Sequence, residues 1–333
     1  MLLIVNEDSA GQRLDNFLFK MIKNFPRSRL YRMIRNGEVR VNSCRSTPNY
    51  KLVKNEEIRI PPLRGLEISS FECDDFNLTL DKIADSIEII SEKFGIMVVN
   101  KPDGISVHGG SGVGYGVIEA MKYLKNNPNL KLAHRLDKAT SGLLLITSRR
   151  SSLIGIQNQL KQGSVKKTYI AICHNNLKVK DAPSRIEKPL LRTFDAKGER
   201  FVKIDNAGQF ALTKIKIIKT INSIKFGVLS LIECYPITGR THQIRVHLSS
   251  AGLPIVGDNK YGLNYDVEAN QLLKKRMYLH SWKISFKNPD LAGKLRFCAS
   301  LPNSFRELVQ VFPDNENFKE DDEPKRRSFF KKI

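Results

Sequence analysis

The apolar residues near the N-terminus repeat with the period of an α-helix. Four of them are spaced i, i+3, i+4 and i+7, which predicts a helix with one buried face over residues 14–21. After a break at Phe25-Pro26, a second helix is predicted with Ser28 as its N-cap and Gly37 in the left-handed turn beyond its end. Short strands are expected over 39–42 and 58–60. This pattern predicts a small compact unit over residues 1–61.

A larger set of strand patterns begins near Ile87. The apolar runs that predict strands lie over 87–90, 95–100, 143–147 and 165–173. Between the last two, Leu153, Ile156 and Leu160 share one face of a predicted helix. Farther along, residues 213–217 alternate between apolar and polar, a turn is expected at Asn222-Ser223, and the chain returns over 226–231. This predicts an antiparallel hairpin with one solvent-exposed face.

The stretches that flank the larger region have another composition. Pro61-Pro62 and Gly65 break the pattern, and acidic residues accumulate as far as Asp85, so residues 62–85 are interpreted as a linker. A second domain is expected over 86–313. The charged tail over 314–333 has few apolar residues and is expected to be disordered.

The charge of the chain narrows the class of partner. The formal net charge is +21 over 333 residues, with a sequence pI near 9.8. A field of this size attracts polyanions and points to nucleic acid, although a general lysine-rich bias without a specific partner would give the same total. A membrane surface is disfavoured, since neither end carries a basic amphipathic helix with a strong apolar face.

Cysteine usage and the N-terminus exclude several other classes. The five cysteines are odd in number and form no Cys-x-x-Cys or Cys/His cluster, which favours a reducing cytoplasm, without structural zinc or disulfides. The first residues lack the features of a secretory signal, and the sequence contains no run of about 18 apolar residues that could span a bilayer.

Residues 134–142 hold the strongest chemical signal. Here Asp137 lies between Arg135 and Lys138 in a segment of turn formers, directly before the apolar run 143–147. A loop held by a strand exposes a functional side chain in a fixed position, and the neighbouring cations favour an ionised carboxylate. A structural interpretation is equally compatible with this local spacing: an Asp that caps a turn and pairs with a neighbouring Arg.

Three motifs resemble those of the RNA pseudouridine synthases of the RluA/RluC type. They are His134-Arg135-Leu136-Asp137 with the Thr-Ser-Gly turn after it, Lys167-Thr168-Tyr169-Ile170-Ala171, and the segment from Gly239 to Arg245 (Gly-Arg-Thr-His-Gln-Ile-Arg). Asn100-Lys101-Pro102 resembles the first motif of the same family. These matches occur in the family's order and span most of residues 86–312.

The N-terminal unit is similar to the S4 RNA-binding domain. The similarity covers the Arg-Leu-Asp-x-Phe-Leu start at Arg13, the Ser-Arg opening of the second helix and the Gly-x-Val-x-Val-Asn end at Gly37. Guanidinium groups on a rigid helix bind phosphates bidentately, and each neutralised phosphate releases counterions. A solvated basic helix face is the alternative. The residues expected to contact RNA in this unit are Arg27, Ser28, Arg29, Arg32 and Arg35.

The resemblance implies a role for each residue of the larger domain's motifs. Asp137 would be the catalytic aspartate and Arg245 would pair with it. Tyr169 would stack on the target base and assist proton movement at C5, and Arg135 would fill the helix space that the flipped nucleotide leaves. The isomerisation has no redox step and no group transfer, so no cofactor or metal is expected. The three histidines His134, His242 and His247 have no metal-ligand spacing and are expected to be structural or to contact RNA.

The pattern and the resemblance together predict an α+β protein. It has a small S4-like domain and a catalytic domain whose mixed, mainly antiparallel sheet is flanked by helices. We expect an enzyme that isomerises uridines of large-subunit (23S-type) ribosomal RNA, as a cytoplasmic monomer. The alternatives are a non-catalytic RNA-binding or ribosome-assembly factor, and a glycoside hydrolase. The second of these usually needs two carboxylates, and only one acid here lies in a motif.

Overall fold

The structure is a computed structural model that describes nine segments of the chain. They are residues 2–5, 9–22, 27–61, 80–109, 115–175, 183–194, 200–223, 227–262 and 276–309. The chain divides into two compact units, Met1–Asn77 and Leu78–Ile333. The predicted tail over 314–333 lies outside the described residues.

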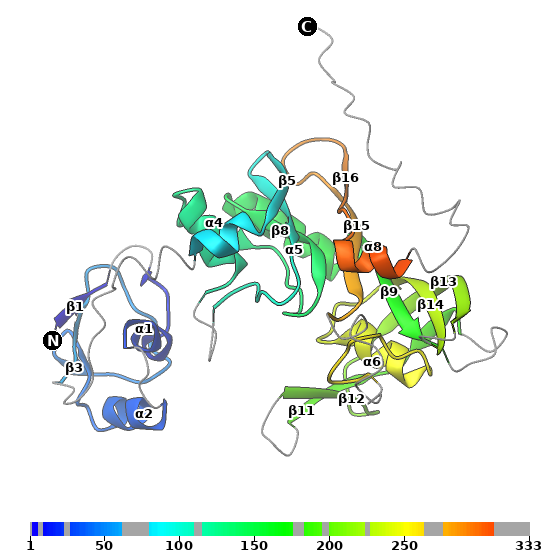
Figure 1. Ribbon diagram of the computed structural model, residues 1–333. Coiled ribbons are helices and arrows are strands. Elements are labelled where there is room, and N and C mark those ends of the chain that lie inside the picture. The colour runs from blue at the N-terminus through cyan, green and yellow to red at the C-terminus, as the bar shows by residue number, and fades with distance from the viewer. Residues whose placement is uncertain are drawn as a thin grey trace, which may run out of the picture. The chain divides into compact units, whose positions relative to one another are not determined.

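The first unit packs two helices against a small antiparallel sheet (Figure 1). The helices are α1 (Leu14–Met21) and α2 (Arg27–Arg35). The sheet has the order β1-β4-β2-β3, and its strands are β1 (Leu2–Ile4), β2 (Arg40–Val41), β3 (Cys44–Arg45) and β4 (Glu57–Arg59). Three residues of the predicted helical face, Leu14, Phe17 and Leu18, are buried in the core of this unit, but the fourth, Met21 at the end of α1, is 40% exposed.

Local contacts fix the ends and the pairing of these helices. Asp15 is buried and joins them, since it accepts hydrogen bonds from Arg13 and from the Tyr31 hydroxyl on α2. Gly37 has φ +75°, so the predicted left-handed turn is confirmed. The predicted cap is wrong: α2 already begins at Arg27, which puts Ser28 in its first turn rather than before it.

The second unit is built on a ten-stranded sheet with the order β10-β13-β14-β9-β15-β8-β6-β5, to which β16 adds on β15 and β7 on β8. Among the described pairings of this sheet, β15 with β8 is parallel and the others are antiparallel. The predicted fold class is therefore confirmed. The strands are β5 (Glu88–Lys93), β6 (Ile96–Lys101), β7 (Lys131–Leu132), β8 (Ser141–Thr147), β9 (Lys166–His174), β10 (Arg185–Glu187), β13 (Leu212–Ser223), β14 (Gly227–Pro236), β15 (Leu279–Lys287) and β16 (Lys294–Cys298), while β11 (Leu190–Phe194) and β12 (Arg200–Ile204) form a separate hairpin.

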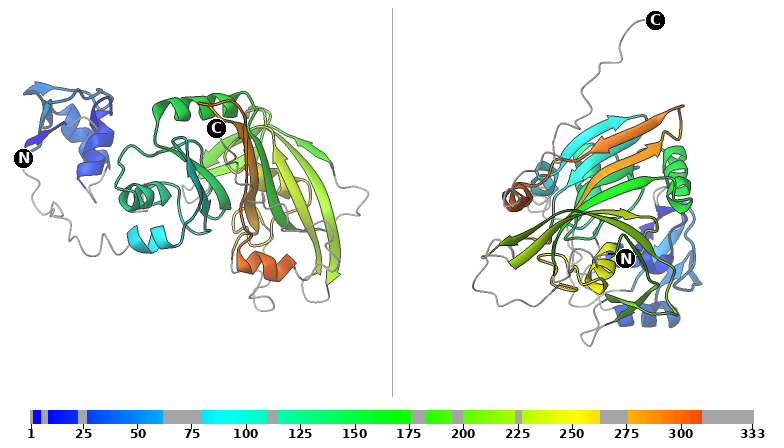
Figure 2. Two further views of the ribbon diagram at one scale, coloured as in Figure 1. Left: turned by 90° about the horizontal axis from the view of Figure 1, so that it is seen from above. Right: turned by 90° about the vertical axis from the view of Figure 1, so that its right-hand side faces the viewer.

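Helices cover the sheet on both faces, as Figure 2 shows for α5 and α8. The helices are α4 (Val117–Leu124), α5 (Arg150–Lys161), α6 (Gln243–Ser250) and α8 (Asn303–Val309). On one face Ile156 of α5 packs with Ile284 and Phe286 of β15. On the other, Phe305 and Leu308 of α8 pack with Ile170 and other apolar residues of the central strands.

Two predicted boundaries differ from the structure. Residues 80–85 form a helix whose Leu80 and Ala84 are buried, so the linker predicted over 62–85 is too long at its end. The acidic residues that suggested a linker, Asp81 and Asp85, occupy the exposed side of this helix. The hairpin β13–β14 is also longer than expected, since its pairing continues as far as Ser223 and Gly227.

Candidate active site

The loop that carries Asp137 is anchored at both ends. It turns through a hydrogen bond from the Thr140 backbone N–H to the Asp137 carbonyl oxygen, 3.1 Å long, and then enters the fully buried strand β8. Gly142 in that strand has φ +107°, and a side chain there would collide with the backbone of Ser281 on β15. The close pairing of β8 with β15, which holds the Asp137 loop in place, therefore requires glycine at residue 142.

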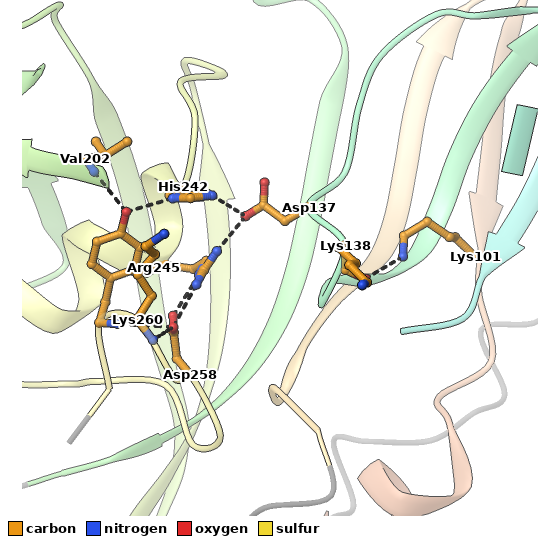
Figure 3. Close-up of polar contacts among 9 residues, drawn as sticks. Lys101, Asp137, Lys138, Val202, His242, Arg245, Asp258 and Lys260 are labelled. Atoms are coloured by element: carbon orange, nitrogen blue, oxygen red, sulfur yellow. Dashed lines mark hydrogen bonds and ion pairs between the residues drawn. The ribbon is translucent and has the colours of Figure 1, made fainter. Parts of the chain in front are cut away.

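Lys101, at the end of β6, holds the same loop in place through its side-chain hydrogen bonds. Its side chain is completely buried, and its Nζ donates to the carbonyl oxygens of Pro102, Ile105 and Lys138 at 2.7, 2.8 and 3.0 Å. Burial lowers the pKa of Lys101 to about 7. The last of these contacts ties the end of β6 to the residue that follows Asp137 (Figure 3).

The segment with Arg245 is the N-terminal turn of α6, and Gln243 locks it to β13. The Gln243 side chain accepts from Thr238 Oγ1 and from the Arg240 backbone N–H, and donates to the Leu212 carbonyl oxygen and Thr213 Oγ1, at 2.7–3.0 Å. His247 lies one turn farther along, completely buried between Thr213 and the Lys188 carbonyl oxygen. Of the two roles expected for His247, structural or RNA-contacting, these buried contacts fit the structural one.

Arg245 joins two carboxylates. Its Nη1 donates to Asp137 Oδ2 at 3.2 Å, while its Nε and Nη2 donate to the two oxygens of Asp258 at 2.7 Å each (Figure 3). The Arg245 and Asp258 side chains are 9% and 1% exposed. Burial opposes the charge of Arg245, but the bonds to Asp258 outweigh it and raise the pKa of the guanidinium. Asp258 acts as an anchor that aims one arm of Arg245 at Asp137.

His242 approaches Asp137 from a strained backbone. It has φ 53°, in the left-handed region, which costs a non-glycine residue roughly 1–3 kcal/mol. Its Nε2 lies 3.9 Å from Asp137 Oδ2, and its Nδ1 is 2.7 Å from the hydroxyl of Tyr261, which itself accepts from the Val202 backbone N–H. Burial lowers the pKa of His242, which favours the neutral imidazole, while Asp137 acts in the opposite direction.

A cavity of about 760 Å³ brings the predicted residues together. Asp137, Tyr169, Arg245 and Arg135 all line it, although they come from three segments far apart in the sequence. Tyr169 is 8% exposed, and burial raises the pKa of its phenol to about 12, so the hydroxyl stays protonated over the neutral range. The cavity therefore presents a partly exposed carboxylate, several guanidinium groups and an aromatic side chain to a ligand.

His134 does not join this group as an acid or a base. Its Nε2 accepts a hydrogen bond from the Leu145 backbone N–H, and burial lowers its pKa to about 4. Among the described residues, no group of three or more His, Cys, Asp or Glu side chains could hold a metal ion. Within those same segments, no helix is long and apolar enough to cross a membrane.

The predicted arginines of the first unit lie on one helix. Arg29, Arg32 and Arg35 of α2 are exposed, while Leu30, Met33 and Ile34 are buried. The side chains of Arg27 and Ser28 lie outside the described residues. The described part of α2 thus presents a basic face to solvent and an apolar face to the core.

Two residues of the site were missed by sequence reasoning, Asp258 and Tyr261. Asp258 follows Gly257 in a turn after the apolar run 254–256, much as Asp137 precedes one. An acid in a turn beside a buried run, within a strongly basic chain, was the available signal. Nothing local connects it to Arg245, thirteen positions earlier.

Comparison with known proteins identifies the families that the two units resemble. The profile of the RNA pseudouridylate synthase family matches residues 95–250, and that of the S4 domain matches residues 12–58. A solved human structure, RNA pseudouridylate synthase domain containing 4, has the same fold with a TM-score of 0.55 at 23% identity, over 72% of this chain and 97% of that one. Fold and site thus define an RNA-modifying isomerase.

Curated relatives extend the match over nearly the whole chain. The ribosomal large subunit pseudouridine synthase C of Haemophilus influenzae is 39% identical over 93% of this chain and 94% of the relative. Its counterpart in Escherichia coli K12 is 36% identical over 93% and 95%. The chain belongs to the RNA pseudouridine synthase family, as an RluC-type member with an N-terminal S4 domain.

Proposed function

We propose that this enzyme converts specific uridines of large-subunit ribosomal RNA to pseudouridine. The activity of the named relatives supports this substrate. The observation that carries the proposal is the cavity that Asp137, Tyr169 and Arg245 line together. The reaction breaks the bond between N1 and C1′, turns the uracil and joins C5 to C1′, while the C5 proton is lost and N1 gains one.

In this proposal Asp137 is the catalytic carboxylate. It is the acid of the cavity that remains partly exposed, at 28%, whereas Asp258 is sealed off by Arg245. Asp137 acts as nucleophile or proton acceptor on the bound nucleotide. Arg245 holds it in place through the 3.2 Å hydrogen bond and balances its charge.

The target uridine must leave its stack, because its glycosidic carbon is out of reach inside a helix. Flipping costs a few kcal/mol and is cheapest in loops. Stacking on Tyr169 returns on the order of 1–3 kcal/mol. Tyr169 also assists the movement of the proton that leaves C5, and exposed Arg135 at the cavity rim fills the space that the nucleotide leaves.

The two units share the work of binding. We propose that residues 1–61 act as an RNA-binding module through Arg27, Ser28, Arg29, Arg32 and Arg35, and that the unit after the linker carries the chemistry. One chain holds all the proposed catalytic residues, which supports a monomer. The reaction is assigned to the cytoplasm, where a ribosomal RNA substrate is made and where the free thiols of Cys44, Cys173, Cys234 and Cys298 stay reduced.

Tritium release tests the proposal. Transcribed large-subunit ribosomal RNA with tritium at uracil C5 is incubated with the wild type and with Asp137→Asn. We expect release with the wild type alone, without added metal or nucleotide, and equal RNA binding by both proteins. Equal binding without release from either would instead favour a non-catalytic RNA-binding factor. Release by Asp137→Asn at the wild-type rate would exclude Asp137 as the catalytic group.

A further inference from the structure

The face of the sheet opposite the active-site cavity carries a second basic feature. Successive residues of a strand point to opposite sides, so Lys166 and Thr168 of β9 face away from Lys167 and Tyr169, which line the catalytic cavity. Lys166 and Thr168 instead line a separate hollow of about 400 Å³ with residues of β15 and β16. Figure 2 shows these strands between α5 on one side and α8 on the other.

Strand register gathers cations on this face. Lys166 pairs with Ser285, Ser285 with Arg296, and Lys283 with both Thr168 and Cys298. Directly paired residues share a face, so Lys166, Lys283 and Arg296 surround one hollow, and Lys287 and Lys294 extend the set by one more pair. We name this set of five residues the rear basic face.

No acidic side chain lines this hollow in the described part of the chain, and the acid on the same face of the neighbouring strand β14 is Glu233, opposite Ile170. The strands β9, β15 and β16 contain no acidic residue. In the turn between β15 and β16, Asp290 accepts a hydrogen bond from Ser152 of α5, on the other side of the sheet. Thr168 adds a hydroxyl to the residues that line the hollow. Lysine, arginine and hydroxyl donors around a hollow with no acidic lining residue suit phosphate oxygens.

We propose that the rear basic face binds the sugar-phosphate backbone of a second segment of the substrate RNA. The inference rests on the proposed function, because it takes the same RNA as partner. A uridine stacked on Tyr169 occupies the opposite face of the sheet, so the helix that delivers it cannot fill this hollow as well. The enzyme therefore recognises a large folded RNA that reaches both faces, and a short hairpin engages the catalytic face alone.

Salt-dependent binding tests this surface. Lys166→Ala/Arg296→Ala is compared with Lys82→Ala/Lys93→Ala, a control that also removes two exposed cations, but cations with acidic sequence neighbours (Asp81 and Glu92). The probes are full-length transcribed large-subunit ribosomal RNA and a short RNA hairpin. For the long RNA we expect the first pair to lower the slope of log Kd against log salt by roughly 1.5 and to weaken binding roughly tenfold. The control should change neither quantity, and hairpin binding should be unchanged in all variants.

Tritium release at saturating RNA separates this inference from the proposed function. The rear-face variant should keep the wild-type rate, because no catalytic group is altered. If it binds the long RNA like the control variant, the face is only solvated. If the rear-face variant loses affinity for the hairpin as much as for the long RNA, the replaced cations only add to the overall positive field of the protein and make no second contact. Either result overturns the inference, whereas absence of tritium release from the wild type would overturn only the proposed function.

Discussion

Replacement of Asp258 by Asn removes one charge from the most buried ion pair that the structure describes in the active site. Asp258 accepts two bonds of 2.7 Å from Arg245 and also binds the backbone N–H groups of Lys260 and Tyr261 through Oδ1. Asparagine keeps the shape of the side chain. However, its NH2 group replaces one of the two acceptors and meets a donor.

The structure sets the size of the expected effect. Loss of one partner from a buried ion pair costs about 3–5 kcal/mol, because the other charge remains buried without compensation. Here the 9% exposed guanidinium of Arg245 would keep its contact with Asp137, and the Asn oxygen would still accept one bond worth about 1 kcal/mol. We therefore expect Asp258→Asn to lower the free energy of unfolding by about 2–4 kcal/mol.

The same substitution should also slow catalysis. Without its anchor, Arg245 no longer aims at Asp137, and misplacement of a catalytic group by about 1 Å costs on the order of 100-fold in rate. Urea denaturation measures the stability, and tritium release at saturating RNA measures kcat. Asp205→Asn is the matched control, because Asp205 directly follows β12, pairs with the exposed Lys203 and lies outside the active-site cavity, so its replacement should change neither quantity noticeably. If Asp258→Asn behaves like this control in both assays, Asp258 does not anchor Arg245.

Three further predictions follow from the supports of the site and from the first unit. Gly142→Ala should unfold at lower urea concentration and lose activity, since φ +107° and the Ser281 backbone leave no room for a methyl group; wild-type stability would contradict this. The pKa of Lys101 is lowered from 10.5 to about 7, so between these pH values the unfolded chain binds more protons than the folded one. The free energy of unfolding of the wild type should therefore rise from pH 7 to 10.5 relative to that of Lys101→Met. Parallel curves for the two proteins would refute the pKa shift. In the first unit, alanine at all three exposed arginines of α2 should weaken RNA binding and make its salt dependence shallower, while kcat on saturating RNA stays unchanged. An unchanged salt slope would exclude α2 as a phosphate-binding helix. The residues replaced are Arg29, Arg32 and Arg35.

The sequence predicts those parts of the fold that depend on local periodicity. The buried faces of α1 and α2, the central strands and the left-handed turn at Gly37 all follow from spacing and residue type. Boundaries are less predictable, because side chains compete near an end. Ser28 is a good cap by type, but α2 starts one residue earlier. Residues 80–85 are acidic enough to suggest a linker, yet they form a helix in which Leu80 and Ala84, four positions apart, are buried and Asp81 and Asp85 are exposed.

The candidate site was predictable only where a motif contains the residue. Asp137, Tyr169 and Arg245 each lie in a recognisable segment, whereas the residues that orient them depend on pairing across the fold. Lys101 lies in a motif as well, but its hydrogen bond to the Asp137 loop arises only because β6 pairs with β8, a contact between segments about forty residues apart. Neither periodicity nor charge specifies this pairing.

Arg245 shows why pairing decides the chemistry. From sequence alone, the guanidinium was expected to pair with Asp137, but two of its three described carboxylate hydrogen bonds go to Asp258. A guanidinium bound bidentately to Asp137 would cover the carboxylate and hinder its approach to a nucleotide. Because Asp258 accepts the two hydrogen bonds from Nε and Nη2, Arg245 contacts Asp137 through Nη1 alone, and the Asp137 side chain stays 28% exposed in the cavity. In the proposed mechanism, the second acid therefore leaves Asp137 free to react with the bound nucleotide.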